Sequence, residues 1–225
     1  MLPDLPPLPI RVDLLPYEAR LDARPRRQVD LVVIHCTELP DLAMARRYGE
    51  EELYPATGTG NSGHYYVDRD GSVHQYVSVE RVAHHTRGYN PRSIGIELDN
   101  TGAHPFAEPQ MAALETVLAA ILARWSITPH RVIGHSDMAP QRKSDPGRHF
   151  DWQRLARQGL SVWPDLGDPT APLATSLTRF GYPEAPPEIR LAAFRLRFRP
   201  WATGPEDAMD RALAQNLAET CASPP

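Results

Sequence analysis

Three short apolar runs, separated by helical or polar stretches, constrain the fold of this chain more than any other feature. The runs are DLVVIH from Asp30, SIGIELD over residues 93–99 and RVIGH over residues 131–135. Runs of this length are typical of strands that are buried on both faces of a sheet. Between the last two, residues 107–125 place apolar side chains at helical spacing, with Pro109 in the first turn. Strands that alternate with helices predict an α/β (α+β) fold with one central sheet.

Further elements are predicted between and after these runs. Asp41 is placed as the N-cap of a helix over residues 41–54, and residues 57–63 form a glycine-rich loop. Residues 64–77 alternate around Asp70-Gly71, which predicts a β-hairpin. A short helix is predicted over residues 151–159.

The pattern changes at both ends of the chain, and we predict four segments. Residues 1–28 are rich in proline and predict an extended lead-in that wraps the surface. Residues 29–163 form the sheet domain, and the turn-rich residues 164–172 form a linker. Three helical patterns over 173–181, 188–199 and 206–219 predict a small helical module spanning residues 173–225.

Charge and composition argue against several classes of protein. The formal net charge is −4 and no basic stripe is present, so we expect no nucleic-acid partner. No apolar run reaches the roughly 18 residues of a membrane-spanning helix. The first residues lack the basic and apolar regions of a secretory signal. We therefore expect a cytoplasmic protein, with the periplasm or cell envelope as the alternative if a signal was removed.

Polar side chains stand where the apolar runs end, which is where active sites of sheet proteins tend to lie. His35 follows LVVI, His135 follows RVIG, Glu97 lies within the middle run, and Asp145 lies in the loop after His135. Two histidines and a carboxylate form a recurring ligand set of catalytic zinc. The alternative is that these histidines are structural.

Lys143 is the only lysine among the 24 Lys and Arg residues of the chain, and it lies two positions before Asp145. A compact ammonium can face a developing oxyanion where a broad guanidinium does not fit. Cys36 next to His35 suggests a Cys–His nucleophile, but neighbouring strand residues point to opposite faces. We therefore interpret Cys36 as a small buried hydrophobic residue.

Four segments resemble one family. VVIHCT, NSGHYYVDRDGSVHQYV, AHHTRGYNPRSIGIELDN and VIGHSDMAPQRKSDPGRHFDW are similar to the N-acetylmuramoyl-L-alanine amidases of the AmpD/AmiD type. This zinc amidase family includes phage lysozyme-type amidases and peptidoglycan recognition proteins. The resemblance runs from about residue 30 to residue 163 and implies a mixed sheet flanked by helices. RFGY and FRLRFRP, near the C-terminus, resemble more weakly the three-helix peptidoglycan-binding module of AmiD-type enzymes.

The resemblance also implies roles for individual residues. It places zinc ligands at His35, His135 and Asp145, the catalytic carboxylate at Glu97 and an oxyanion-stabilising lysine at Lys143. It places His85 near the substrate, and we expect His64 and Asn90 to bind substrate as well.

Two positions depart from the family pattern. His84 stands where many members have Trp, which puts stacking against the substrate at that wall in doubt. Gly63 stands where phage-type members have a catalytic tyrosine, which favours Glu97 as the proton carrier.

The implied activity is zinc-dependent hydrolysis of the amide between N-acetylmuramic acid, or its 1,6-anhydro form, and L-alanine of the stem peptide. The expected partner is polymeric peptidoglycan or a soluble anhydro-muropeptide, in cell-wall turnover or recycling. The alternative is a non-catalytic peptidoglycan receptor. Receptors of this family lack one or more zinc ligands, whereas this chain retains all three and the lysine.

Overall fold

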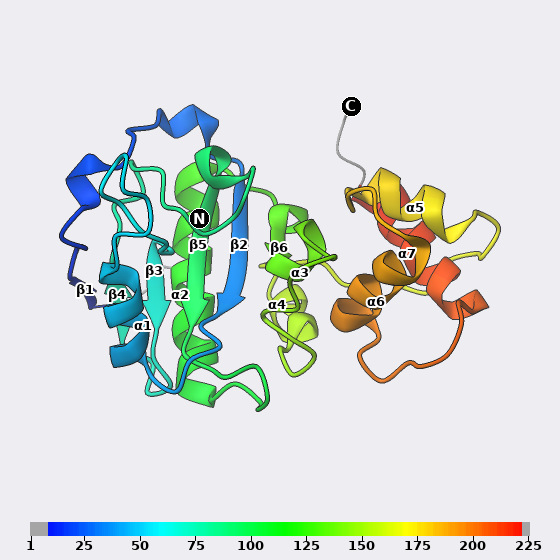
Figure 1. Ribbon diagram of the computed structural model, residues 1–225. Coiled ribbons are helices and arrows are strands. Elements are labelled where there is room, and N and C mark those ends of the chain that lie inside the picture. Colours follow the sequence, from blue (N-terminus) through cyan, green and yellow to red (C-terminus); the bar gives the residue numbers. More distant parts are fainter. Residues whose placement is uncertain (1–8, 222–225) are drawn as a thin grey trace.

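A six-stranded mixed sheet forms the centre of the molecule in the computed structural model, which describes residues 9–221 (Figure 1). The strand order is β1-β4-β3-β5-β2-β6, and only the β3–β4 pair is antiparallel. The predicted mixed α/β fold is thus confirmed. The strands are β1 Ile10–Val12, β2 Leu31–Cys36, β3 Tyr65–Val67, β4 Val73–Gln75, β5 Ser93–Leu98 and β6 Val132–Gly134.

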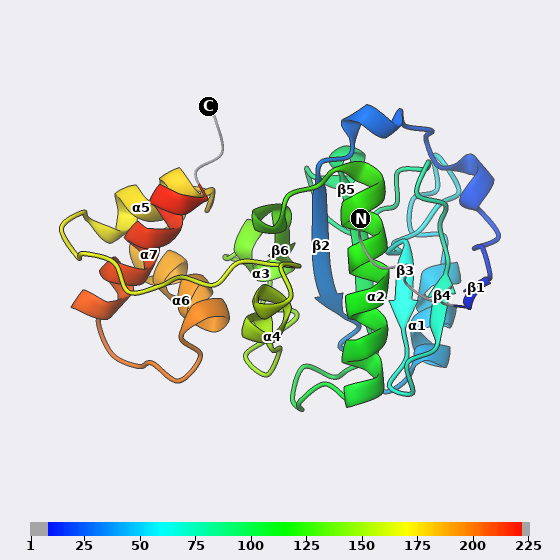
Figure 2. The ribbon, with the colours of Figure 1, turned by 180° about the vertical axis from the view of Figure 1, so that it is seen from behind.

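Helices lie on both faces of this sheet. Helix α2 (Glu108–Trp125) runs along one face, as Figure 2 shows, and α1 (Leu42–Glu50) lies on the other. The remaining helices of residues 9–160 are α3 (His135–Met138), α4 (Trp152–Arg157) and the short 3-10 helices Glu18–Arg20, Arg26–Gln28, Asn90–Arg92 and Pro129–Arg131. None of the helices among residues 9–221 is long and apolar enough to cross a membrane.

The core between α2 and the sheet follows from the apolar spacing of the helix. Leu114, Val117, Leu118 and Ile121 recur at three- and four-residue intervals and are buried against the strands. Helix α2 ends where Ser126 adopts a left-handed backbone with φ of 55°.

The N-terminal segment is more structured than the predicted lead-in; residues 1–8 lie outside the described residues. Strand β1 pairs with β4 and forms one edge of the sheet. Leu15, Tyr17 and Leu21 are buried in a second core, together with side chains of β3 and the residues after β4. The prolines disfavour a long α-helix here and leave room only for short 3-10 turns, but these apolar side chains still pack.

Two predicted element boundaries are corrected. Helix α1 ends at Glu50, four residues before the predicted end. The predicted strand over 131–135 ends at Gly134, and His135 is the first residue of α3. The turn at Gly134 is tightly packed, because an added Cβ would lie 3.0 Å from Pro146 Cδ and 3.2 Å from Trp152 Cζ2.

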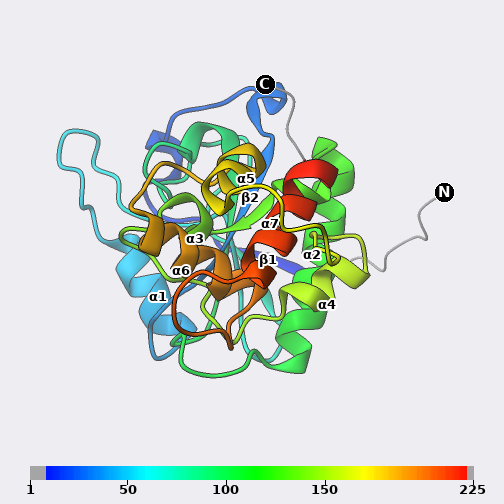
Figure 3. The same ribbon diagram turned by 90° about the vertical axis from the view of Figure 1, so that its right-hand side faces the viewer.

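Residues 173–221, here called the helical unit, contain α5 (Leu173–Phe180), α6 (Pro187–Phe198) and α7 (Ala208–Thr220). Residues 222–225 of the predicted module lie outside the described residues. The three helices have a core of their own, which includes Leu177, Phe194 and Leu217. Figures 1 and 3 show that the unit lies beyond β6, next to α3 and α4.

We expect Leu118→Ala to destabilise the sheet domain. The Leu118 side chain is fully buried between α2 and the strands, so its truncation leaves a cavity. Such substitutions cost about 2–5 kcal/mol. Urea unfolding measures this loss, with Leu166→Ala as control, because Leu166 is 70% exposed. Equal unfolding midpoints for the two variants would contradict the packing described.

Candidate metal centre and active site

The register of two parallel strands places His35 beside Glu97. Strands β2 and β5 pair so that His35 stands opposite Glu97, and paired residues of neighbouring strands project from the same face. His35 Nδ1 is 3.9 Å from Glu97 Oε1. Tyr66 of β3 is the partner of Glu97 on its other side, so the three residues form a row across the sheet.

Strand β6 lies on the opposite side of β2 and brings His135 to the same place. Gly134 is the partner of Ile34, so the residues that follow them are neighbours. The rings of His35 and His135 have centroids 4.5 Å apart. The loop after α3 brings Asp145 back beside His135. There the Asp145 carbonyl accepts a hydrogen bond from the Ser136 N–H at 3.0 Å.

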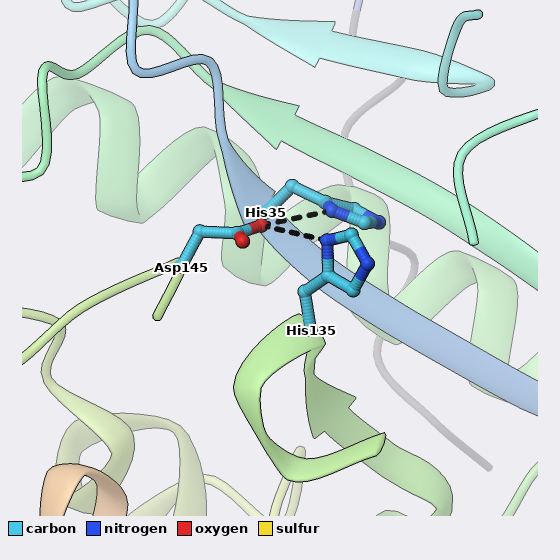
Figure 4. A group of neighbouring side chains, drawn as sticks. All are labelled: His35, His135 and Asp145. Atoms are coloured by element: carbon cyan, nitrogen blue, oxygen red, sulfur yellow. Dashed lines mark hydrogen bonds and ion pairs between the residues drawn. The ribbon is translucent and has the colours of Figure 1, made fainter. Parts of the chain in front are cut away.

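One carboxylate oxygen joins these two histidines. Asp145 Oδ2 lies 3.0 Å from His35 Nδ1 and 3.2 Å from His135 Nδ1 (Figure 4). Burial alone would raise the pKa of Asp145, but its contacts with His135 and His35 hold that pKa well below the ordinary value. The carboxylate is therefore charged at neutral pH.

These three buried residues could hold a metal ion. One potential ligand atom from each lies within 4.8 Å of the others. Burial lowers the pKa of His35 to about 4, so its ring is neutral, as a metal ligand must be. His135 Nε2 and Asp145 Oδ1 are buried without a hydrogen-bond partner among the described residues. Unsatisfied buried polar atoms are costly, and metal coordination would satisfy such a donor set.

His85 contacts one residue of this cluster. Its Nδ1 lies 2.9 Å from His35 Nε2, and its Nε2 lies 3.1 Å from Ser93 Oγ. The ring packs against Gly95, where an added Cβ would lie 2.6 Å from His85 Nδ1. His85 lines the cleft, and it also orients the His35 ring.

The two other predicted substrate residues differ in position. Asn90 lines the cleft, and its Oδ1 accepts hydrogen bonds from the backbone N–H groups of His85 and Thr86. His64 does not line the cleft, because its side chain is completely buried behind it. There His64 Nδ1 accepts from the Gly95 N–H, and Arg24 Nη2 lies 2.8 Å from His64 Nε2.

An open cleft of about 530 Å³ lies over the cluster. Lys143 borders it with a side chain that is 34% exposed, and Lys143 Nζ is 3.7 Å from Glu38 Oε2. Glu97 faces the same cleft and is mostly buried. Burial and the charge of Asp145 raise the pKa of Glu97 to about 8, with Lys143 acting in the opposite direction.

Three further side chains line the cleft. Glu38, which faces Lys143, was not predicted from the sequence. Tyr66 was also missed, although it lies two positions after His64 on a strand; its hydroxyl accepts from the Gly63 N–H at 3.2 Å. Cys36 is buried, and burial raises the pKa of its thiol to about 12, so the thiol is protonated and a poor nucleophile.

The glycine at position 63 leaves room for Glu97. A Cβ added at Gly63 would lie 3.0 Å from Glu97 Cγ. A larger side chain at that position would displace the Glu97 carboxylate from its place in the cleft.

Two histidines and a carboxylate at the carboxyl ends of strands, with a glutamate and a lysine in the same cleft, are typical of metal-dependent hydrolases. Residues 25–148 match the family described as N-acetylmuramoyl-L-alanine amidase. The chain belongs to this family, as the sequence resemblance predicted.

Named relatives agree with this assignment. The chain is 38% identical over 160 residues to the N-acetylmuramoyl-L-alanine amidase AmiD of Escherichia coli (strain K12), and the match covers 58% of each protein. It therefore spans about three fifths of the length of that relative. The 1,6-anhydro-N-acetylmuramyl-L-alanine amidase AmpD of Haemophilus influenzae is 31% identical, over 59% of this chain and 84% of AmpD.

Solved structures share the architecture. E. coli AmiD in complex with anhydro-N-acetylmuramic acid-L-Ala-D-gamma-Glu-L-Lys superposes with a TM-score of 0.76 at 31% identity, over 88% of this chain and 91% of AmiD. AmpDh3 from Pseudomonas aeruginosa gives a TM-score of 0.75 at 26% identity, over 86% and 92%. Coverage of this extent includes much of the helical unit.

We expect the Glu97 carboxyl of the metal-free protein to titrate near pH 8, because burial and Asp145 disfavour its ionised form. The group is then protonated below this pH and ionised above it. Carboxyl carbon NMR follows the titration, and Glu97→Gln identifies the signal. A midpoint near 4.5, the ordinary value for glutamate, would contradict the description of the site.

Proposed function

We propose that this protein hydrolyses the amide bond between N-acetylmuramic acid, or its 1,6-anhydro form, and L-alanine of peptidoglycan stem peptides. The observation that carries the proposal is Asp145 Oδ2 between His35 and His135, with Glu97 beside them in the cleft. The family and the likeness to AmiD, whose structure holds an anhydro-muropeptide, support the substrate class.

We assign zinc as the cofactor, with His35, His135 and Asp145 as its ligands. The buried, neutral His35 ring, the charged carboxylate and the unsatisfied atoms of His135 and Asp145 suit this donor set. Zinc bound there would act as a Lewis acid toward the scissile carbonyl and lower the pKa of water to about 7.

Glu97 is the proton carrier of the proposed reaction. It takes a proton from the attacking water as the water oxygen bonds to the carbonyl carbon. It then gives that proton to the amide nitrogen as the carbon–nitrogen bond breaks. The products are the lactyl carboxylate of the muramic acid and a peptide with a free L-alanine amine. The ionised form of Glu97 takes the proton and the protonated form gives it; with a pKa raised to about 8, both forms are present near neutral pH.

Lys143 is the second charged group at the reacting carbonyl. As the water adds, negative charge develops on the carbonyl oxygen, and an ammonium at the edge of the cleft stabilises it. Glu38 holds the Lys143 side chain at this edge through the 3.7 Å contact.

The first test is mass spectrometry of a soluble anhydro-muropeptide incubated with the protein. We expect release of the peptide with a free L-alanine amine, loss of this activity with a zinc chelator and recovery on adding zinc. Cleavage of polymeric peptidoglycan alone would assign the envelope form of the substrate. A zinc-loaded protein that cleaves neither substrate would refute the proposal and favour the receptor.

We expect Lys143→Ala to retain zinc but to have a kcat lower by a factor of about 10²–10³, as is usual when one oxyanion contact is removed. Steady-state kinetics and metal analysis of the same preparation measure both quantities. Arg157→Ala is the matched control, since Arg157 is an exposed cation outside the cleft. A rate for Lys143→Ala equal to that of this control would exclude the role of the lysine.

We expect His35→Ala to lose bound zinc and activity together, because His35 supplies one of three protein ligands. Metal content after dialysis is the measurement. His104→Ala serves as control, since His104 is an exposed histidine away from the cluster. Retention of one zinc per chain by His35→Ala would show that the ligand assignment is wrong.

A further inference from the structure

A buried ion pair joins the helical unit to the turn that carries His135. Arg197, on α6, lies against Asp137, on α3, with Arg197 Nη1 2.6 Å from Asp137 Oδ2. Both side chains are almost completely removed from solvent. Asp137 is two residues after His135, so the ion pair connects the helical unit to the turn that carries a proposed zinc ligand.

The guanidinium of Arg197 holds this turn at two points. While Nη1 contacts Asp137, Nη2 donates to the Val132 carbonyl at 3.0 Å. Val132 begins β6, and Asp137 lies within α3. His135 stands between these two anchors, at the junction of strand and helix. These two contacts of one guanidinium therefore fix the direction in which the chain leaves the sheet.

The Asp137 carboxylate accepts hydrogen bonds from three donors, of which Arg197 is the first. Its Oδ2 also accepts from the Gly134 N–H at 2.8 Å, and its Oδ1 accepts from the Tyr182 hydroxyl at 2.7 Å. Tyr182 belongs to the helical unit, as Arg197 does. Two of the three donors to Asp137 therefore come from the helical unit, and the third is the backbone next to His135.

The position of Arg197 is itself rigid. Its guanidinium carbon lies 4.2 Å from the centroid of the Trp152 ring, and Nη2 is also 3.1 Å from Ser161 Oγ. Trp152 also packs closely against Gly134, as described above. A side chain held by an aromatic ring, a hydroxyl, a carbonyl and a carboxylate has little freedom to move.

We propose that Arg197 is a positioning residue of the metal site: through Asp137 it holds His135 in the place where it meets Asp145 and His35. The helical unit is then a structural part of the site, whatever ligand its outer surface binds. This inference rests on the ligand set proposed above and adds to it a contribution from outside the catalytic domain.

Zinc affinity of the full chain, without substrate, tests the proposal. Competition with a chromogenic chelator gives the zinc Kd, and the visible spectrum of the Co²⁺ form reports the geometry of the ligands. Loss of a partner that orients a metal ligand typically weakens metal binding by 10–100-fold. We expect a weakening of about this size for Arg197→Met, with an altered Co²⁺ spectrum. Arg197→Lys retains the charge but cannot reach both anchors, so its Kd lies between those of Arg197→Met and the wild type.

Arg195→Met is the matched control on the same helix. Arg195 is also buried in an ion pair, with Asp210, but every contact of that pair lies within the helical unit. We expect Arg195→Met to destabilise the helical unit and to leave the zinc Kd within about twofold of wild type. Equal weakening by both variants would overturn the proposal, since a general loss of stability would then account for it. An unchanged Kd in folded Arg197→Met would overturn it as well.

Tyr182→Phe is a second variant, to be measured if Arg197→Met does not fold. This substitution removes one hydrogen bond to Asp137 and leaves the shape and charge of the side chain almost unchanged. A zinc Kd raised several-fold supports the proposal, and an unchanged Kd refutes it. Failure of the wild type to bind zinc would instead refute the proposed function, so the two failures are distinguishable.

Discussion

The pairing of β2 with a parallel neighbour on each side is the constraint on which the site depends. β5 places Glu97 beside His35 through its register with β2, and β6 places His135 there through the residue after Gly134. Three segments separated by tens of residues thus end at one edge of the sheet. The backbone pairing of β2 sets these positions independently of the contacts between the side chains of the cluster.

Around this edge, the polar groups lie in successive layers. His35 contacts His85, and His85 contacts Ser93. Behind them, His64 and Arg24 bind backbone groups of the strand that carries Glu97, since Arg24 also donates to the Ser93 carbonyl. The N-terminal segment therefore supports the site from one side, as the helical unit does from the side of β6. The histidine rings at the centre of the site need such support, because hydrogen-bond partners fix the orientation of a ring that is to bind a metal.

Much of this architecture could be predicted from the sequence, because its signals are local. Continuous apolar runs identify the strands on either side of the cluster, and polar residues at their ends indicate His35, Glu97 and His135. The boundary at His135 could not be predicted, since one polar residue ends a strand or begins a helix with equal ease. The strand β1 within the proline-rich segment is also a long-range effect, because three residues form a strand only when β4 offers its edge.

The contacts that the sequence did not indicate join residues far apart in the chain. His64 is covered by Arg24, which lies 40 positions earlier in the chain. Asp137 forms its ion pair with Arg197, which lies 60 positions later. The arginines of α6 illustrate this most clearly. Arg195 and Arg197 look alike in FRLRFRP, yet the first binds within the helical unit and the second binds the sheet domain.

The buried carboxylates of this protein differ in their neighbours, and the neighbours determine whether a carboxylate has a structural or a chemical role. Asp137 accepts hydrogen bonds from Arg197, Tyr182 and a backbone N–H, so its contacts lie within the fold. Asp145 is held between two histidines, which keep its pKa low and suit it to a cation. Glu97 stands 3.9 Å from His35, beyond hydrogen-bond distance, and its pKa is raised. Of the three, Glu97 has the carboxyl that exchanges its proton near neutral pH, which is what amide hydrolysis requires of a proton carrier.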